Sequence, residues 1–240
     1  MPQPLPSAIE RHPHLAAPLP AGQVRVDLHS HTMWSGDSTT TPEEIEQAVV
    51  EAGLDVLCIT DHHAVRGARE LTPRLAALGC RVIVGEEMRT HQGEIIGLFL
   101  SERIPHGLSS REAAEAIRAQ GGLVYVPHPF DPTKRNLAEP ALLDLVAAGL
   151  VDALEAFNAK TSLASLNARA AQFAGEHGLA PGAGSDGHVP HALGAAYVEM
   201  PDFEGPADFL TALHAGRIVG HHWDQHRPWQ PRILPSITVE

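Results

Sequence analysis

The stretch "VDLHSHTMWSGDS", residues 26–38, begins with an apolar run and ends in two histidines and a carboxylate. His29 and His31 are two residues apart, so they point to the same face if this run is a β-strand. Asp37 follows in a turn rich in glycine and serine. Paired imidazoles with a nearby carboxylate are the residue types that bind transition metals, and a metal site requires further ligands from elsewhere in the chain.

The rest of the chain alternates helix-like segments with apolar, strand-like runs. A glycine separates helix from strand at Gly53, Gly79, Gly121, Gly149 and Gly178. This alternation is typical of βα units around a parallel sheet that is covered on both faces. The sequence therefore predicts a single α/β domain.

The first of these helices is marked at both ends. Thr41 is a suitable N-cap, Pro42 suits the first helical position, and Glu44 completes a capping box. Apolar residues then recur at helical spacing until Gly53, which predicts a helix between residues 41 and 53.

The composition limits the classes of function. The chain has 240 residues and a formal net charge of −12, which argues against broad nucleic-acid binding because that needs a basic surface. No apolar run approaches the roughly 18 residues of a membrane helix. Cys58 and Cys80 lie in or beside apolar runs, which predicts buried, reduced thiols. We therefore expect a cytoplasmic protein without a membrane span.

Residues 1–22 are rich in proline and differ from the rest of the chain. They lack the basic and apolar regions of a signal peptide, so we expect a loose leader. Residues 23–240 contain no candidate linker, so we expect them to form one domain.

Metal-ligand residue types recur just after five of the predicted strands. In an α/β barrel the carboxyl ends of the strands meet on one face, so this recurrence favours a barrel over an open sheet. Imidazole with carboxylate and no thiolate suits Zn²⁺, Mn²⁺ or Fe²⁺, and so many ligands predict two or three divalent ions. The residues at these strand ends are His29 and His31; Asp61, His62 and His63; Glu86 and Glu87; His128; Asp186 and His188.

The motifs "DLHSH", "TDHH", "GEE", "PHP" and "GSDGH", in this order, resemble the PHP family, which is named for its members among polymerases and histidinol phosphatases. The resemblance covers nearly all of residues 24–220. It implies a distorted (β/α)7 barrel with its active site at the C-terminal ends of the strands, up to three metal ions, and phosphoesterase activity. Residues 23–240 would then be a PHP-type metal-dependent hydrolase domain.

The resemblance also implies which residues bind the ions, with Glu87 rather than Glu86 as the bridging carboxylate. His29, His31, Glu87 and Asp186 would hold one ion. Asp37, His62 and His188 would hold a second, and Glu87 and His128 a third.

The chain departs from the family pattern at one ligand. Many members with three ions have a histidine at the start of the strand that reads "GEIIGLFL" here, where this chain has Glu94. Either Glu94 ligates a third ion, or His91 does so, or the enzyme works with two ions.

Residues around the ligands have less specific patterns. Asp27 shares the face of His29 and could orient a ligand imidazole, whereas Asp61 and His63 should point away from His62. Five further histidines lie outside the ligand pattern and are interpreted as surface or packing residues: His12, His14, His221, His222 and His226.

Four polar residues on loops and strand ends are candidates for binding the substrate. Lys134 and Arg135 follow "PHPFDP", and Asn158 and Lys160 follow another predicted strand at the same end of the barrel. A phosphate ester needs such cations and donors in addition to the metal ions.

The prediction is a metal-dependent phosphoesterase that hydrolyses a small phosphomonoester, with a metal-bridging hydroxide attacking phosphorus in line. The alternatives are a PHP-type 3′–5′ exonuclease, an amidohydrolase-type barrel, and a non-catalytic metal-stabilised module. The acidic charge and scarce aromatic residues favour a small substrate over nucleic acid.

Overall fold

The computed structural model of the protein describes residues 6–223. Nine strands form one sheet in the order β7-β6-β5-β4-β3-β2-β1-β8-β9. The strands are β1 (Gln23–Ser30), β2 (Val56–Ile59), β3 (Arg81–Thr90), β4 (Gly93–Leu98), β5 (Leu123–Val126), β6 (Ala153–Asn158), β7 (Ala180–Gly184), β8 (Ala196–Pro201) and β9 (Arg217–Gly220).

The first seven strands curl into a nearly closed barrel. Its two ends meet where the His29 carbonyl accepts a hydrogen bond from the Asp186 amide at 2.8 Å, and where the His31 amide donates to the Gly187 carbonyl at 2.9 Å. Neighbouring strands in this set run parallel except for β4, which is antiparallel to β3 and β5. The predicted distorted α/β barrel is therefore confirmed.

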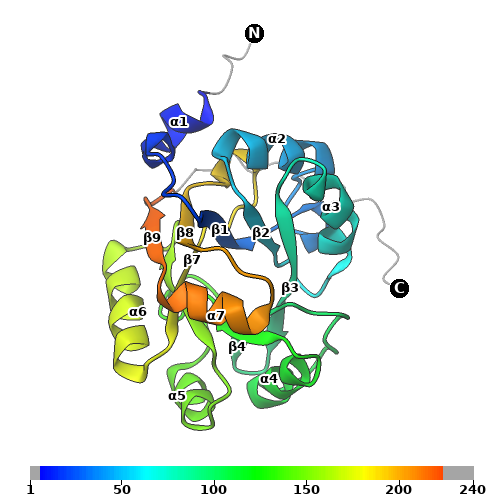
Figure 1. Cartoon of the computed structure of the whole chain (residues 1–240). Coiled ribbons are helices and arrows are strands. Elements are labelled where there is room, and N and C mark those ends of the chain that lie inside the picture. The colour runs from blue at the N-terminus through cyan, green and yellow to red at the C-terminus, as the bar shows by residue number, and fades with distance from the viewer. Residues whose placement is uncertain (1–5, 224–240) are drawn as a thin grey trace.

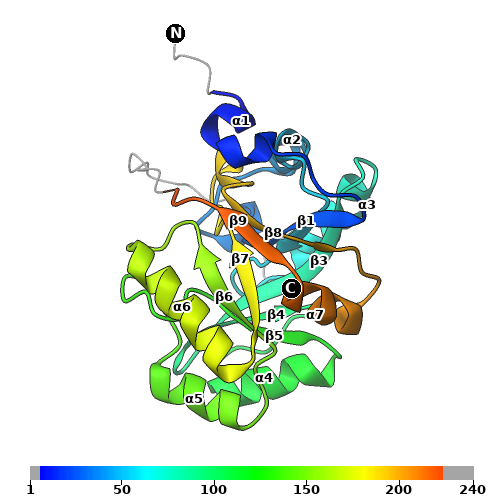
Figure 2. The ribbon, with the colours of Figure 1, turned by 60° about the vertical axis from the view of Figure 1, so that its left-hand side comes forward.

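Helices cover the outside of this barrel (Figures 1 and 2). Helix α2 begins at Pro42 with the predicted Thr41–Glu44 capping box and ends at Gly53, which is left-handed with φ 60°. The helices are α1 (Ala8–Arg11), α2 (Pro42–Ala52), α3 (Arg66–Ala76), α4 (Ser110–Ala119), α5 (Glu139–Ala147), α6 (Ala164–His177) and α7 (Pro206–His214), with short 3₁₀ turns η1 (Pro13–Ala16), η2 (Met33–Ser35) and η3 (Pro190–Ala192).

The apolar residues form three buried clusters around the barrel wall. One lines the barrel and reaches α7, and it includes the fully buried Leu28 and Tyr125. A second packs α4, α5 and α6 against the sheet, and a third packs α2 and α3. Cys58 and Cys80 are buried free thiols, as predicted. None of the helices in residues 6–223 is both long and apolar enough to span a membrane.

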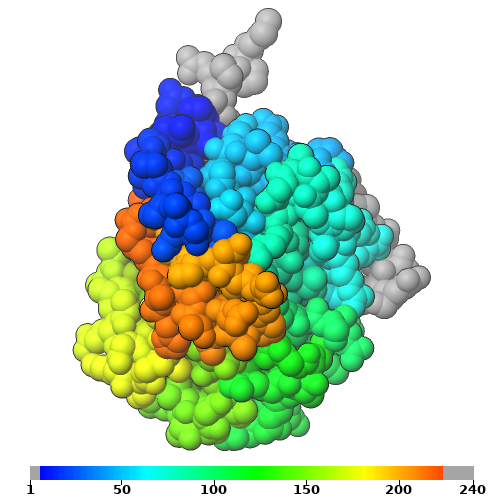
Figure 3. Space-filling view, in the orientation of Figure 1, coloured from blue at the N-terminus to red at the C-terminus, as the bar shows by residue number. Residues whose placement is uncertain are grey.

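Two regions differ from the expectations. Strand β9 was not predicted, because Arg217–Gly220 is too short and too exposed to stand out in the sequence. The expectation of a loose leader is wrong for residues 8–16, which form α1 and η1 and bury Ala8, His12 and Leu15. In Figure 3 this segment lies against α2 and beside β9. The boundary at residue 22 stays a prediction, and residues 224–240, with His226, lie outside the described part of the chain.

Candidate metal centre

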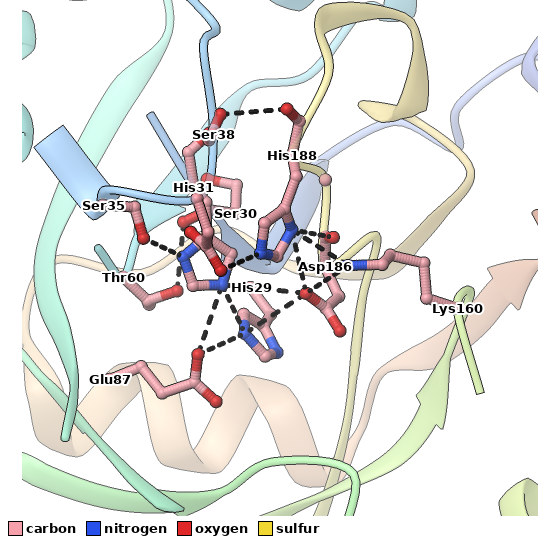
Figure 4. Close-up of polar contacts among 12 residues, drawn as sticks. His29, Ser30, His31, Ser35, Ser38, Thr60, Glu87, Lys160, Asp186 and His188 are labelled. Atoms are coloured by element: carbon pink, nitrogen blue, oxygen red, sulfur yellow. Dashed lines mark hydrogen bonds and ion pairs between the residues drawn. The ribbon is translucent and has the colours of Figure 1, made fainter. Parts of the chain in front are cut away.

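The carboxyl ends of β1, β2, β3, β5 and β7 bring all eight predicted ligands into one cluster. Their donor atoms form overlapping groups in which every atom lies within 4.8 Å of the others. Figure 4 shows His29, His31, Glu87, Asp186 and His188 facing one another across this cluster. The groups are His31, Asp37, His62 and His188; His29, His31 and Glu87; His29, His128 and Asp186; and Glu87, Glu94 and His128.

The first predicted group, which consists of His29, His31, Glu87 and Asp186, is built from β1, β3 and the turn after β7. The Nε2 atoms of His29 and His31 are 3.0 Å apart, and each is 3.2–3.3 Å from Oε2 of Glu87. Oδ1 of Asp186 lies 3.9 Å from His29 Nε2 and 3.7 Å from His31 Nε2. Ligand atoms at roughly 2 Å from a tetrahedral ion lie roughly 3.3 Å apart, so these spacings fit a bound divalent ion.

The second group lies beside the first, at the more open side of the cluster. Oδ2 of Asp37 is 3.1 Å from His188 Nε2 and 3.4 Å from His62 Nε2. His62 Nδ1 is in turn 3.4 Å from Oε2 of Glu87, so the Glu87 carboxylate lies between the two groups. The Asp37 side chain is 45% exposed, which places this group nearest to solvent.

The third group contains Glu94 and not His91. Oε1 of Glu87 is 3.1 Å from His128 Nε2, and Oε2 of Glu94 is 3.8 Å from the same nitrogen. His91 is exposed on the turn between β3 and β4. The structure therefore brings together a third potential ion-binding group, made of two carboxylates and one imidazole.

Hydrogen bonds from the outer ring nitrogens fix several imidazoles. Nδ1 of His29 is 3.1 Å from Glu155 Oε1, Nδ1 of His31 is 2.8 Å from Ser35 Oγ, and Nδ1–H of His188 donates to the Asp186 carbonyl at 2.8 Å. Each bond leaves Nε2 facing the cluster in a form that can bind an ion. This arrangement fits divalent metal ions.

The pKa values of Glu87 and His29 are shifted because buried carboxylates and imidazoles lie close together. Burial raises the pKa of Glu87, but His29 and the other imidazoles outweigh burial and hold that pKa well below its usual range. Burial lowers the pKa of His29, but the Glu155, Asp186 and Glu87 carboxylates outweigh it and hold that pKa well above its usual range. Carboxylates this buried need cations, and bound metal ions would supply them.

The backbone is shaped to bring these ligands close. His128 and Asp186 have left-handed φ angles of 28° and 48°, which are uncommon for residues other than glycine. Gly184, just before this turn, lies so close to β1 that an added Cβ would be 2.4 Å from the His29 Cβ. Such strain is typical of functional sites, where the surrounding structure enforces it.

Two of the four predicted substrate-binding residues are lysines that reach the predicted ligand Asp186. The Lys134 ammonium contacts Oδ2 of Asp186, and Lys160 Nζ is 3.2 Å from Oδ1 and 3.0 Å from His188 Nδ1. Both lysines thus lie at the edge of the metal groups. Arg135 is exposed, and its carbonyl accepts a hydrogen bond from the Glu94 amide at 2.8 Å.

Asn158, the fourth of these residues, lies beneath Asp186 with no exposed surface. Its Nδ2 donates to Glu155 at 2.9 Å and to Asp186 at 3.1 Å, and its Oδ1 accepts from the Lys160 amide at 2.8 Å. Because the amide is engaged on both sides, Asn158 supports a ligand here and presents no free group to a substrate.

Glu155 is a residue of the site that the sequence reasoning missed. It is fully buried in β6, contacts His29, and accepts a hydrogen bond from the His128 amide at 2.7 Å. A carboxylate in the middle of the apolar strand "ALEAFN" is the signal that could have revealed it.

Two other predicted roles have clear outcomes. Asp27 accepts from the backbone amides of His29 and Ser185 at 3.1 and 3.0 Å, so it fixes the strand and not the imidazole ring. Asp61 points away from His62 as expected and accepts from the Thr32 amide and hydroxyl, both at 2.6 Å.

Comparisons with known proteins find relatives of this chain in sequence and in fold. A family model described as PHP-associated matches residues 164–218. The uncharacterized protein MJ1587 of Methanocaldococcus jannaschii is 40% identical over 57% of this chain and 82% of its own. The uncharacterized protein MJ0417 of the same organism is 33% identical over 79% of each chain.

The structure of a two-domain Bacteroides vulgatus protein that contains a predicted PHP-like metal-dependent phosphoesterase superposes with a TM-score of 0.70. It is 19% identical, and the match covers 85% of this chain and 67% of that one. The chain belongs to the PHP family. The residues of the PHP sequence motifs at the strand ends are thus the same residues that lie together in the buried cluster.

Proposed function

We propose that this PHP protein is a metal-dependent phosphoesterase that hydrolyses small phosphomonoesters. The observation that carries the proposal is the convergence of the eight predicted ligands on overlapping groups spaced for divalent ions. A degenerate, non-catalytic PHP module is expected to lose several ligands, whereas this chain keeps all but one and has Glu94 in place of that histidine.

The proposed ligands are His29, His31, Asp37, His62, Glu87, His128, Asp186 and His188, with Glu94 in the third group. Two or three Mn²⁺, Fe²⁺ or Zn²⁺ ions bound there would supply Lewis acidity and lower the pKa of a water nucleophile. Glu87 contacts residues of all the groups, so it serves as the shared carboxylate. Asp37, the most exposed ligand, marks the side from which substrate approaches.

Lys134 and Lys160 are proposed to bind the phosphoryl oxygens. Burial lowers the pKa of Lys134, but Asp186 outweighs burial and raises the pKa, so the ammonium stays charged at neutral pH. Two cations fixed beside the ligands match the charge of a phosphate group, and Arg135 lies farther out on the same loop.

The charge of the whole chain favours a small substrate. A net charge of −12 repels a polyanion at long range, whereas a monoester with about two charges responds mainly to the local field of the site. We therefore propose that nucleic acid is a poor substrate.

The test is a comparison of kcat/KM on protein reconstituted with Mn²⁺, Fe²⁺ or Zn²⁺. The panel contains sugar phosphates, nucleoside monophosphates and amino-alcohol phosphates, with a labelled single strand as the competitor. We expect turnover of at least one monoester at a higher kcat/KM than that of the strand. Faster digestion of the strand from its 3′ end would overturn the small-molecule assignment, and turnover of neither class with ions bound would overturn the phosphoesterase.

The Lys160→Met variant tests the proposed phosphate contact. We expect a rise in KM of about tenfold or more, because a charge-assisted hydrogen bond to the substrate is lost. Arg135→Met, on the exposed side of the same site, should have the smaller effect. An equal metal content in both variants would show that the difference arises in substrate binding.

A further inference from the structure

Arg89 places a cation at the third ligand group. In the β3–β4 hairpin, Arg89 pairs directly with Glu94, and Glu87 lies two residues earlier on β3. Directly paired residues of antiparallel strands share a face, as do residues two apart, so one face of the hairpin carries Glu87, Arg89 and Glu94. The register that brings Glu94 to the site therefore brings Arg89 with it.

The two oxygens of Glu94 have different neighbours. Oε1 is 3.2 Å from Nε of Arg89, whereas Oε2 is the oxygen that faces His128 Nε2. The Glu94 side chain is 6% exposed and that of Arg89 is 45% exposed, so the guanidinium reaches in from the surface to a buried carboxylate. A carboxylate buried this deeply needs a compensating positive charge nearby, and the Arg89 guanidinium supplies one.

The third group offers an ion a single imidazole, and neither of its carboxylates serves that ion alone. It has three ligands, and one of them, Glu87, also contacts His29, His31 and His62. The other carboxylate, Glu94, is already paired with Arg89. The first group, by contrast, keeps two imidazoles and two carboxylates even though lysines contact Asp186.

We propose that Arg89 is a built-in counter-charge of the third group: it neutralises Glu94 when no ion is bound there and weakens the binding of a third divalent ion. The third ion is then the exchangeable one, and its occupancy follows the metal concentration while the other two ions stay bound. This inference rests on the proposed metal centre and names how occupancy of that centre is controlled.

The experiment is a Mn²⁺ titration of the full-length protein after removal of metal with a chelator, followed by electron paramagnetic resonance of free Mn²⁺. We compare the wild type with Arg89→Gln. We expect Arg89→Gln to bind the weakest ion about tenfold or more tightly, because a positive charge a few ångströms from the ion is removed. The two tighter ions should keep their affinities.

Two further variants make the comparison specific. Arg66→Gln removes an exposed arginine that pairs with Glu70 on α3 and not with a proposed ligand, and should change no affinity. In a Glu94→Gln background, Arg89→Gln should lose its effect, because the carboxylate that it neutralises is gone.

The outcomes separate this inference from the proposed function. A wild type that binds two ions and an Arg89→Gln variant that binds three would support it, as would a third ion that simply binds more tightly. If Arg89→Gln binds the third ion equally or more weakly, Arg89 orients Glu94 and the inference is overturned while the metal centre stands. If the wild type binds no Mn²⁺ at all, both fail.

Discussion

The protein contains two clusters of histidines whose closest contacts look alike but whose surroundings differ. In the metal centre, Nε2 of His29 and Nε2 of His31 are 3.0 Å apart. In a second cluster, Nδ1 of His12 and Nε2 of His221 are 2.9 Å apart, where the N-terminal segment meets the chain after β9. A short contact between two imidazoles therefore does not by itself identify a metal site.

The two clusters differ in the groups that surround their imidazoles. Around His29 and His31 the next groups are carboxylates, and both Nε2 atoms face the shared cluster. Around His12 they are the His191 carbonyl, 3.0 Å from Nε2, and the rings of His14 and Trp223. The groups of three or more metal-binding side chains found within residues 6–223 do not include His12. We interpret the second cluster as a packing contact made by neutral imidazoles.

The largest expected effect comes from removing one imidazole of each cluster. His29→Ala should lose bound metal, and its kcat/KM should fall by about a thousandfold or more, because the first group loses a ligand. His12→Ala should keep the metal content of the wild type. Elemental analysis and phosphate release measure both properties, on proteins first shown to be folded by circular dichroism.

If His12→Ala also released metal while remaining folded, the proposed difference between the two histidine clusters would be wrong. The terminal cluster would then belong to the metal chemistry and not to packing.

The next effect concerns Glu155, which has no counterpart among the described partners of His12. Glu155→Gln should weaken metal binding by about 10–100-fold, because the carboxylate that orients His29 becomes a neutral amide. Competition with a coloured chelator measures this affinity.

The matched control is Glu176→Gln, the same substitution at an exposed position of α6. It should leave metal affinity unchanged, because the Glu176 carboxylate accepts its hydrogen bond from Gln172 on the surface of the helix. Unaltered affinity in Glu155→Gln would show that the His29 ring is held by packing alone.

The sequence predicted the clustered side chains better than the residues that support them. His29, His31 and Asp186 follow apolar strands, and the topology of an α/β barrel brings such strand ends together. Glu155 and Arg89 lie within strands, and their roles depend on which strands are neighbours. The pairing of Arg89 with Glu94 follows from the hairpin register, which the sequence does not show.

The N-terminal segment is a second case in which contacts between distant parts of the chain could not be predicted from the sequence. Its prolines suggested a loose leader, yet His12 is buried. That burial depends on contacts with residues about 180 to 210 positions later in the chain, which local sequence patterns do not reveal. The segment is rich in proline, as its composition indicates, but long-range packing nevertheless orders it.

The smallest expected effect is a pH dependence that belongs to the terminal cluster. Burial, with smaller contributions from His221, His14 and Arg11, lowers the pKa of His12 from 6.5 to about 4, although its bond to the His191 carbonyl favours the charged form. A neutral His12 therefore stabilises the fold fully above pH 6.5, and this contribution is lost as the pH falls toward 4. We expect this contribution to fall by about 1 kcal/mol for each pH unit between 6.5 and 4.5.

Urea unfolding of the wild type and of His12→Gln between about pH 7 and pH 4.5 measures this contribution. Acid also protonates the metal ligands, but that effect is shared by both proteins and cancels in their difference at each pH. The free energy of unfolding of His12→Gln should therefore fall less steeply with acid than that of the wild type, because glutamine does not titrate. Parallel curves would mean that His12 takes up a proton in the folded state as readily as in the unfolded chain, and the contrast between the two clusters would then lose its electrostatic basis.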